Sequence, residues 1–225
     1  MKFWLVIILA TIALPVAFAE KGTFVDQIQF IQYLDENTAL EEVRNGNLDM
    51  YYFRISSDRL EAEKDRDGIQ VFESTGGSYS ILVNPSVSED FNPFSISELR
   101  FALNHLVDRN LIVNELIGGY GRTMISNYGI FAADYLTIID EIESFHFKHN
   151  PSFANQIITE ELEKAGAEKI DNYWYYDGKQ IEITFFIRSD DPVRKSIGEI
   201  LSSELENVGF KVKKDFGDLN KAFVV

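Results

Sequence analysis

The most informative segment of the chain is "LRFALNHLVDRNLIVNELIGGYG", which spans Leu99–Gly121. Apolar residues recur in it at intervals of three and four, which indicates a helix with one buried face. They are Leu99, Ala102, Leu103, Leu106, Val107 and Leu111. Asp108 and Arg109 lie beside that stripe, and Gly118–Gly119 supplies a left-handed helix stop. Because no neighbouring side chains complete a catalytic set, we expect the charged pair to be scaffold, either solvated or joined in a local ion pair.

Upstream of this helix, the pattern predicts a strand–helix–strand unit of the length of a βαβ crossover. Its strands are residues 24–33 and 48–55, and Asn37 or Thr38 caps the short helix between them. Residues 69–85 have the composition of two further strands, separated by a pair of glycines. Ser95 and Glu98 then have the spacing of a capping box that would open the long helix.

Downstream, residues 122–151 are predicted to be rich in loops, and Asn150 opens a helix that stops at Gly166. Asp177–Gly178 is a strong hairpin signal between an aromatic strand and an apolar strand. The chain ends in the apolar residues 220–225, which suggest the beginning of another strand.

The second strand of that hairpin leads into a helix and then another strand. Asp190 or Asp191 is the expected N-cap, Pro192 takes the first helical position, and Gly209 ends the helix. A strand–helix–strand order implies a parallel pair of strands. The sequence therefore predicts an α/β fold, with an open mixed sheet covered by helices.

Composition and charge exclude several classes of function. The chain has 225 residues, a net charge of −15 and no cysteine. Such an acidic chain is a poor partner for nucleic acid or for an anionic membrane surface, which both need clustered Lys and Arg. Without cysteine, disulfides, thiolate metal sites and cysteine nucleophiles are excluded.

The first residues have the pattern of a secretory signal peptide. Lys2 precedes a long apolar run that ends in Ala17-Phe18-Ala19, a small-x-small cleavage pattern, before the charged Glu20. We therefore expect a signal peptide at residues 1–19, a mature domain at 20–225, and export to the periplasm or the cell surface. An uncleaved membrane anchor is the alternative.

No catalytic or nucleotide-binding motif is present, and we predict no catalytic residue and no cofactor. His105 lies in the long helix and is expected to be structural. His146 and His149 are close enough in sequence to share a metal ion, but Glu141 and Glu143 would have to complete the site. We therefore assign no metal ligand, and metal capture by this pair stays an alternative.

Arg188 is placed where a strand ends and a helix begins, the usual position of ligands in open α/β sheets. Its guanidinium could hold a carboxylate through two parallel hydrogen bonds. The alternative is that Arg188 neutralises Asp190 and Asp191.

Several segments, in order, resemble the family 5 extracellular solute-binding proteins, the peptide and nickel receptors of ABC importers. The quoted segment is similar to the family's R-x-A-L-N-x-x-[IV]-D-R-x-x-[IL]-[IV]…G-x-[GA] stretch. Its matching residues are Arg100, Ala102, Leu103, Asn104, Val107, Asp108, Arg109, Ile112, Val113, Gly118 and Gly121. An upstream segment resembles the family's A-x-x-x-L-x-x-G-x-[IL]-D unit through Ala39, Val43, Gly46, Leu48 and Asp49. "SYSILVNP" resembles its cleft-edge strand, and residues 177–213 resemble its strand–helix–strand unit.

The resemblance implies one lobe of a type II periplasmic-binding-protein-like fold, in which two lobes close on a ligand. It implies that residues 20–225 are a partial domain, mostly of second-lobe material, with the C-terminal part missing and with a complementary chain as a possible partner. The implied partners are ABC permease subunits and a short peptide or other small solute. The expected ligand-facing residues are Tyr79, Ser80, Asn84, Tyr120 and Arg188. The alternatives are a surface interaction lobe without a solute and a nickel receptor.

Overall fold

The computed structural model describes residues 25–53, 55–64, 68–72, 77–87, 90–126, 128 and 133–224. The predicted signal peptide lies outside these residues. The chain divides into two compact units, one ending at Arg54 and the other beginning at Ile55. No helix of the described residues is long and apolar enough to cross a membrane.

The first unit contains one described helix, α2 (Glu36–Arg44). Asp35 caps it by accepting a hydrogen bond from the Thr38 backbone nitrogen at 2.9 Å, so the predicted cap was displaced by a few residues. The strands predicted at 24–33 and 48–55 are wrong over the described residues, which have no strand assignment. Strand formation needs a hydrogen-bonded neighbour and a surface to pack on. Phe30 and Phe53, from the two predicted strands, are instead 78% and 71% exposed.

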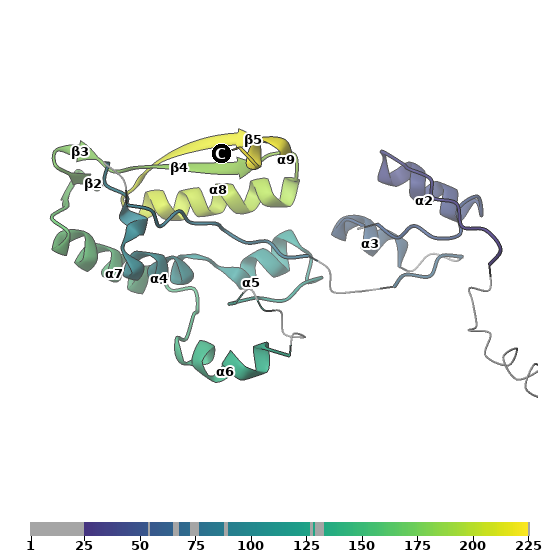
Figure 1. The fold of residues 1–225 in the computed structure, drawn as a ribbon, viewed down its shortest axis with the longest axis horizontal. Coiled ribbons are helices and arrows are strands. Elements are labelled where there is room, and N and C mark those ends of the chain that lie inside the picture. The colour runs from purple at the N-terminus through teal and green to yellow at the C-terminus, as the bar shows by residue number, and fades with distance from the viewer. Residues whose placement is uncertain are drawn as a thin grey trace, which may run out of the picture. The chain divides into compact units, whose positions relative to one another are not determined.

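The second unit packs helices against two small sheets (Figure 1). Its helical elements are α3 (Ser57–Glu63), η2 (Pro93–Ser95), α4 (Ser97–Leu106), α5 (Arg109–Leu111), η3 (Ile112–Leu116), α6 (Tyr135–Ser144), α7 (Pro151–Lys164), α8 (Pro192–Asn207) and α9 (Leu219–Ala222). Its strands are β1 (Glu168–Ile170), β2 (Tyr173–Tyr176), β3 (Lys179–Gln180), β4 (Glu182–Arg188) and β5 (Lys211–Gly217). Strands β1, β2 and β3 form an antiparallel sheet, while β4 and β5 form a parallel pair. The predicted mixed α/β class with open sheets is confirmed.

The predicted long helix is divided in two. Helix α4 ends at Leu106, and Val107 has an extended backbone. Asp108 then caps α5, because its Oδ1 accepts the Leu111 backbone N–H at 2.9 Å. The predicted stop at Gly118–Gly119 is confirmed, since both residues have positive φ.

The capping box expected at Ser95 and Glu98 is wrong. Ser95 belongs to η2, and its hydroxyl donates to the Asn92 carbonyl oxygen at 2.8 Å. Asn92 caps this short turn by accepting from the Phe94 nitrogen at 3.0 Å, and α4 begins without a side-chain cap. The Asn92 cap, just upstream, therefore forms in place of the expected Ser95–Glu98 capping box.

The downstream half follows the prediction closely. Asn150 caps α7, and the Asp177–Gly178 turn has the paired positive φ values of a tight hairpin. Asp191 caps α8 with Pro192 at its first position, and β4 and β5 pair in parallel from Glu182↔Lys211 to Arg188↔Gly217.

Three further expectations are corrected. No strand is assigned to the described residues of 69–72 and 77–85, and residues 219–222 form helix α9 instead of a strand. Asp218 caps α9 by accepting from the Lys221 nitrogen, which favours a helical turn over an extended end. The segment expected to be loop-rich contains α6, whose isoleucines have helical spacing.

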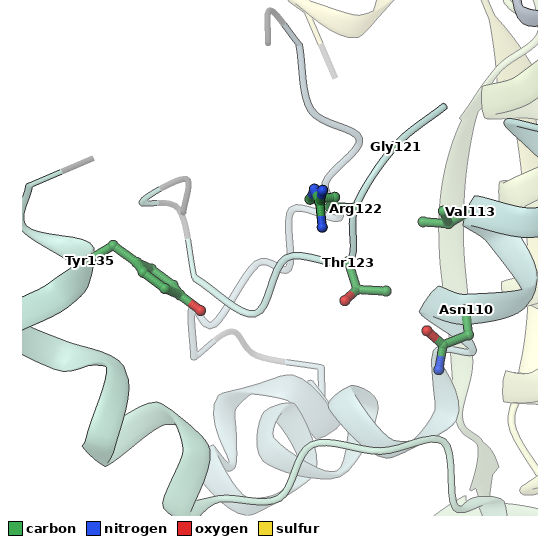
Figure 2. A pocket seen from close by; sticks show the side chains of 6 residues that line it. All are labelled: Asn110, Val113, Gly121, Arg122, Thr123 and Tyr135. Carbon is green, nitrogen blue, oxygen red and sulfur yellow. The ribbon is translucent and has the colours of Figure 1, made fainter. Parts of the chain in front are cut away.

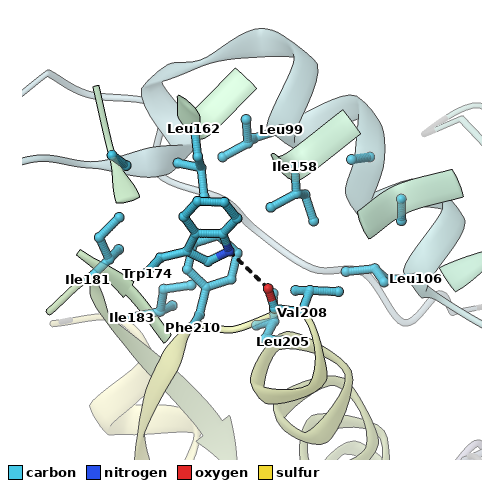
Figure 3. Close-up of a cluster of buried hydrophobic side chains, with 13 residues drawn as sticks. Leu99, Leu106, Ile158, Leu162, Trp174, Ile181, Ile183, Leu205, Val208 and Phe210 are labelled. Carbon is cyan, nitrogen blue, oxygen red and sulfur yellow. Dashed lines mark hydrogen bonds between the residues drawn. The ribbon is translucent and has the colours of Figure 1, made fainter. Parts of the chain in front are cut away.

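The core lies between α4, α7, the β1–β2–β3 sheet and the C-terminal end of α8. Trp174 and Phe210 are completely buried at its centre, among leucine and isoleucine side chains (Figure 3). The Trp174 indole N–H donates to the carbonyl oxygen of Val208 at 2.9 Å, which satisfies the one polar atom of this side chain. The packing therefore fixes the antiparallel sheet to the end of α8, the helix that carries the candidate site at its other end.

Candidate functional site

Arg188, the last residue of β4, lies where the parallel strands meet the beginning of α8. Its Nε and Nη2 atoms donate to the two carboxylate oxygens of Asp190, at 2.9 and 2.7 Å. Arg188 therefore already holds a carboxylate in the forked geometry that a ligand would use. This is the neutralising role that the sequence left open, with Asp190 as the direct partner.

The forked pair has an electrostatic signature that can be measured. The hydrogen bond from Arg188 holds the pKa of the Asp190 carboxyl below its ordinary value of 3.8. Because the pKa of Asp190 is lower in the folded state than in the unfolded state, its ionised carboxylate stabilises the fold. This contribution is fully present above the pKa of the unfolded state and is lost as the pH falls through the pKa of the folded state.

We expect an NMR titration of Asp190 to have its midpoint below 3.8 in the native chain. In Arg188→Gln, the midpoint should rise towards the ordinary value, because the main stabilising donor is gone. Equal midpoints in the two chains would show that the pair does not form in solution.

Tyr79 lies against the first turn of α8. The guanidinium of Arg194 is 5.1 Å from the centre of the Tyr79 ring, and its Nη1 is 3.7 Å from an Asp191 carboxylate oxygen. The structure thus brings Tyr79 and Arg188 to the same end of α8, and adds Arg194, which the sequence analysis missed. The signal was available, since Arg194 is the third residue of a helix that begins at Pro192.

Asn84 has a local structural role. Its Oδ1 accepts the Ser86 backbone N–H at 3.0 Å, and its carbonyl oxygen accepts from the Asn92 amide at 2.9 Å. Ser80 is exposed on the same extended segment. The expected cleft edge is therefore extended chain, with no strand pairing among the described residues, and Asn84 holds its turn.

Tyr120 belongs to a separate cluster. Its hydroxyl donates to the Glu61 carboxylate and accepts from Lys64 Nζ at 3.2 Å, while Lys64 lies 2.8 Å from Glu61. These hydrogen bonds lower the pKa of Glu61 and raise that of Lys64. They tie the loop after η3 to the end of α3, and none of these hydrogen bonds involves Arg188 or Tyr79.

The expectation that Asp108 and Arg109 are scaffold agrees with their contacts, although they do not form the expected local pair. Arg109 donates from Nε to the Met124 carbonyl oxygen at 3.0 Å, and from its two Nη atoms to Asn104 at 2.9 and 2.7 Å. Burial lowers the pKa of its guanidinium. Arg109 therefore fixes the chain near Met124 against the end of α4.

The histidines show no shared metal geometry. His105 is buried among phenylalanine rings, with Nδ1 3.0 Å from the Lys148 carbonyl oxygen, in agreement with a structural role. His149 lies 3.3 Å from Asp108 through Nδ1. Within the part of the chain that the structure describes, no group of three or more His, Asp or Glu could hold a metal ion.

Two hollows lie beside the chain that Arg109 fixes. The larger, here the Arg122 hollow, has a volume of about 410 Å³ and is lined by Asn110, Val113, Gly121, Arg122, Thr123 and Tyr135 (Figure 2). The smaller, here the Asp108 hollow, has about 60 Å³ and shares Asn110 and Thr123 with it. Neither includes any of the predicted ligand-facing residues, and the sequence analysis predicted neither hollow.

Comparison with known proteins settles the family. A family model described as "Bacterial extracellular solute-binding proteins, family 5 Middle" matches residues 18–223. The chain belongs to this family. This match confirms the resemblance seen in the sequence. Because family 5 is a family of solute-binding proteins, the prediction that the chain is not an enzyme is confirmed as well.

The periplasmic oligopeptide-binding protein OppA of Haemophilus influenzae is 26% identical over 152 residues, which are 67% of this family 5 chain and 26% of OppA. The oligopeptide-binding protein AppA of Bacillus subtilis, solved with a nonapeptide, matches with a TM-score of 0.58 at 20% identity, over 84% of this chain and 35% of AppA. NikZ of Campylobacter jejuni, solved with Ni(L-His), matches with a TM-score of 0.53 at 21% identity, over 82% of this chain and 35% of NikZ.

These structural likenesses establish the fold of a periplasmic binding protein. The chain spans about a third of the length of these two structures and about a quarter of OppA. A third match with a TM-score of 0.58 is an oligopeptide-binding protein of Thermotoga maritima with mannohexaose bound. Because peptide, nickel complex and oligosaccharide all occur on this fold, its ligand must be argued from the site.

Proposed function

We propose that this family 5 chain is an exported solute-binding component of an ABC importer, which binds a short peptide or a similar small solute and delivers it to a membrane permease. The family match over residues 18–223 carries this proposal. The acidic net charge of −15 and the signal-peptide pattern at residues 1–19 are consistent with an exported binding protein.

The proposed ligand-facing residues are Tyr79, Ser80, Asn84, Tyr120 and Arg188. Of these, Tyr79 and Arg188 lie at the beginning of α8, while Tyr120 belongs to the cluster with Glu61 and Lys64. Both partners of the Arg188–Asp190 pair keep part of their side-chain surface open to solvent. A peptide carboxylate would displace Asp190 from Arg188, while the Tyr79 ring and the Arg194 guanidinium flank the same helix end. Such an exchange replaces one carboxylate by another, so it contributes modestly to affinity and mainly orients the solute.

Arg188→Gln should weaken peptide binding several-fold, because the forked donor of the site is lost. Isothermal titration with a peptide that binds the native chain measures the change. Lys179→Gln is the matched control, since it removes an exposed positive charge outside the site. Equal affinity in the native chain and Arg188→Gln would remove Arg188 from the surface.

The class of solute is tested by thermal shift. A ligand that binds only the folded state stabilises it by RT ln(1 + [L]/Kd), so the melting temperature rises with the logarithm of the ligand concentration once this exceeds the dissociation constant. We expect a rise with pools of short peptides and none with nickel–histidine at the same concentration. A rise with nickel–histidine alone would favour the nickel alternative.

A second candidate function is an interaction lobe that pairs with a complementary chain. Large apolar side chains outside the described helices and strands favour it, since Leu34 and Leu82 are each 95% exposed and Phe53 is 71% exposed. Exposed apolar surface of this kind often marks an interface. Light scattering of the purified chain, together with binding of a dye that recognises exposed apolar surface, tests the idea. A monomer that does not bind the dye would count against it.

A further inference from the structure

The Arg122 hollow has an unusual charge for this protein. The chain has 36 acidic residues against 21 Lys and Arg, yet none of the six residues that line the hollow is acidic. Its charged residue is Arg122, which is exposed. Among the described residues, no carboxylate lies within salt-bridge distance of this guanidinium, whereas Arg188 and Arg194 each have an aspartate.

The remaining polar groups of the hollow suit an anion. Asn110, Thr123 and Tyr135 each carry a hydrogen-bond donor, and Figure 2 shows the hydroxyl groups of Thr123 and Tyr135 pointing into the space between them. No described hydrogen bond occupies these two hydroxyl groups. A carboxylate placed here would meet one guanidinium and several neutral donors.

Hydrogen bonds from neighbouring residues fix the backbone that lines the hollow. Arg109 donates to the Met124 carbonyl oxygen, next to Thr123, and is fixed in turn by two hydrogen bonds to Asn104. Asp108 caps the short helix that carries Asn110. The neighbouring Asp108 hollow is lined by two cationic residues, Arg109 and Lys148, and by one carboxylate, that of Asp108. The residues that line the two hollows therefore have a net positive charge, although the whole chain is strongly acidic.

We propose that the Arg122 hollow binds the carboxylate of a small organic solute, with Arg122 as the ionic partner and Thr123, Tyr135 and Asn110 as hydrogen-bond donors. Its volume of about 410 Å³ is within the range of small-molecule sites. The inference rests on the proposed function and names a different place for the solute's carboxylate. For a ligand with one carboxylate, such as a short peptide, the contact with Arg122 is an alternative to the contact with Arg188, and the two variants distinguish them.

The test is a titration of the full chain with dialanine, dialanine amide, succinate and inorganic phosphate, followed by NMR of the Gly121 and Thr123 backbone amides. We expect dialanine to bind and to shift these two amides. Dialanine amide should bind at least about tenfold more weakly, because a charged hydrogen-bonded pair is lost. If succinate binds more tightly than dialanine, the carboxylate that the hollow recognises belongs to an organic acid and not to a peptide.

Arg122→Gln should weaken the same titration at least about tenfold, while Lys179→Gln, with its 82% exposed side chain, should leave it unchanged. Thr123→Val gives a second variant that keeps the charge and removes one donor, with a loss of a few-fold expected. Equal binding by Arg122→Gln, equal binding of the amide, or binding of phosphate alone would overturn the inference.

The outcome is separable from that of the proposed function. If peptides raise the melting temperature and Arg188→Gln weakens them while Arg122→Gln does not, only the carboxylate hollow is wrong. If dialanine and succinate both fail to bind the native chain, the hollow is likewise excluded, and the thermal shift with peptide pools decides the proposed function independently.

Discussion

Trp174→Ala is expected to lower the free energy of unfolding by about 3–5 kcal/mol. Trp174 is 0% exposed and packs against Phe210, Leu162 and their neighbours in the core. Its removal leaves a large cavity and also deprives the Val208 carbonyl oxygen of the indole donor at 2.9 Å. Since small proteins unfold at a cost of about 5–15 kcal/mol, such a loss is a large part of the total. Urea unfolding followed by circular dichroism measures it.

Trp174→Phe separates packing from hydrogen bonding. Phenylalanine fills much of the volume but cannot donate, although Lys169 still donates to the Val208 oxygen at 3.3 Å. We expect a loss of about 1–2 kcal/mol. A loss below about 1 kcal/mol for the alanine variant would show that this tryptophan is not at the centre of the core.

Gly209→Ala is expected to cost about 2–4 kcal/mol, from backbone strain and a steric clash together. Gly209 ends α8 with φ +106°, a conformation that side chains rarely adopt. An added Cβ would lie 2.7 Å from the Asn172 carbonyl oxygen and 3.0 Å from Trp174 Cδ1. The backbone there cannot move freely, because the Gly209 oxygen accepts from the Trp174 nitrogen at 2.9 Å.

Gly178→Ala is the matched control. It has a similar left-handed backbone, with φ +73°, but nothing lies within 4 Å of an added Cβ. Only the conformational cost of about 1–2 kcal/mol should appear. If both variants unfold at the same urea concentration, the close approach of α8 to the antiparallel sheet is not present in solution.

The parts of the fold that were predictable carry local signals. The cap and proline at the beginning of α8, the Asp177–Gly178 turn and the cap of α7 each depend on residues a few positions apart. The sequence analysis gave neutralisation of Asp190 and Asp191 by Arg188 as an alternative for the same reason, since these residues are two and three positions apart, but it did not predict the forked pair with Asp190.

Some wrong predictions have a local cause, such as the Asn92 cap that replaced the expected capping box, but others concern contacts between residues far apart in the sequence. A β-branched, aromatic segment such as residues 25–33 has strand composition, but a strand also needs a neighbour, and none is paired with it among the described residues. The contact between Tyr79 and Arg194 joins positions far apart in the chain, and the Arg122 hollow depends on how α6 lies beside the loop after η3. Such features become visible only when the chain is folded.

The central claim, that this family 5 chain binds a small organic solute, is tested most directly by native mass spectrometry of the purified chain with an equimolar set of short peptides, nickel–histidine and mannohexaose. The account predicts a bound species whose added mass equals a short peptide and which is depleted in Arg188→Gln. A spectrum that contains only the free chain with all three classes of solute, under conditions in which the chain is folded, would contradict it.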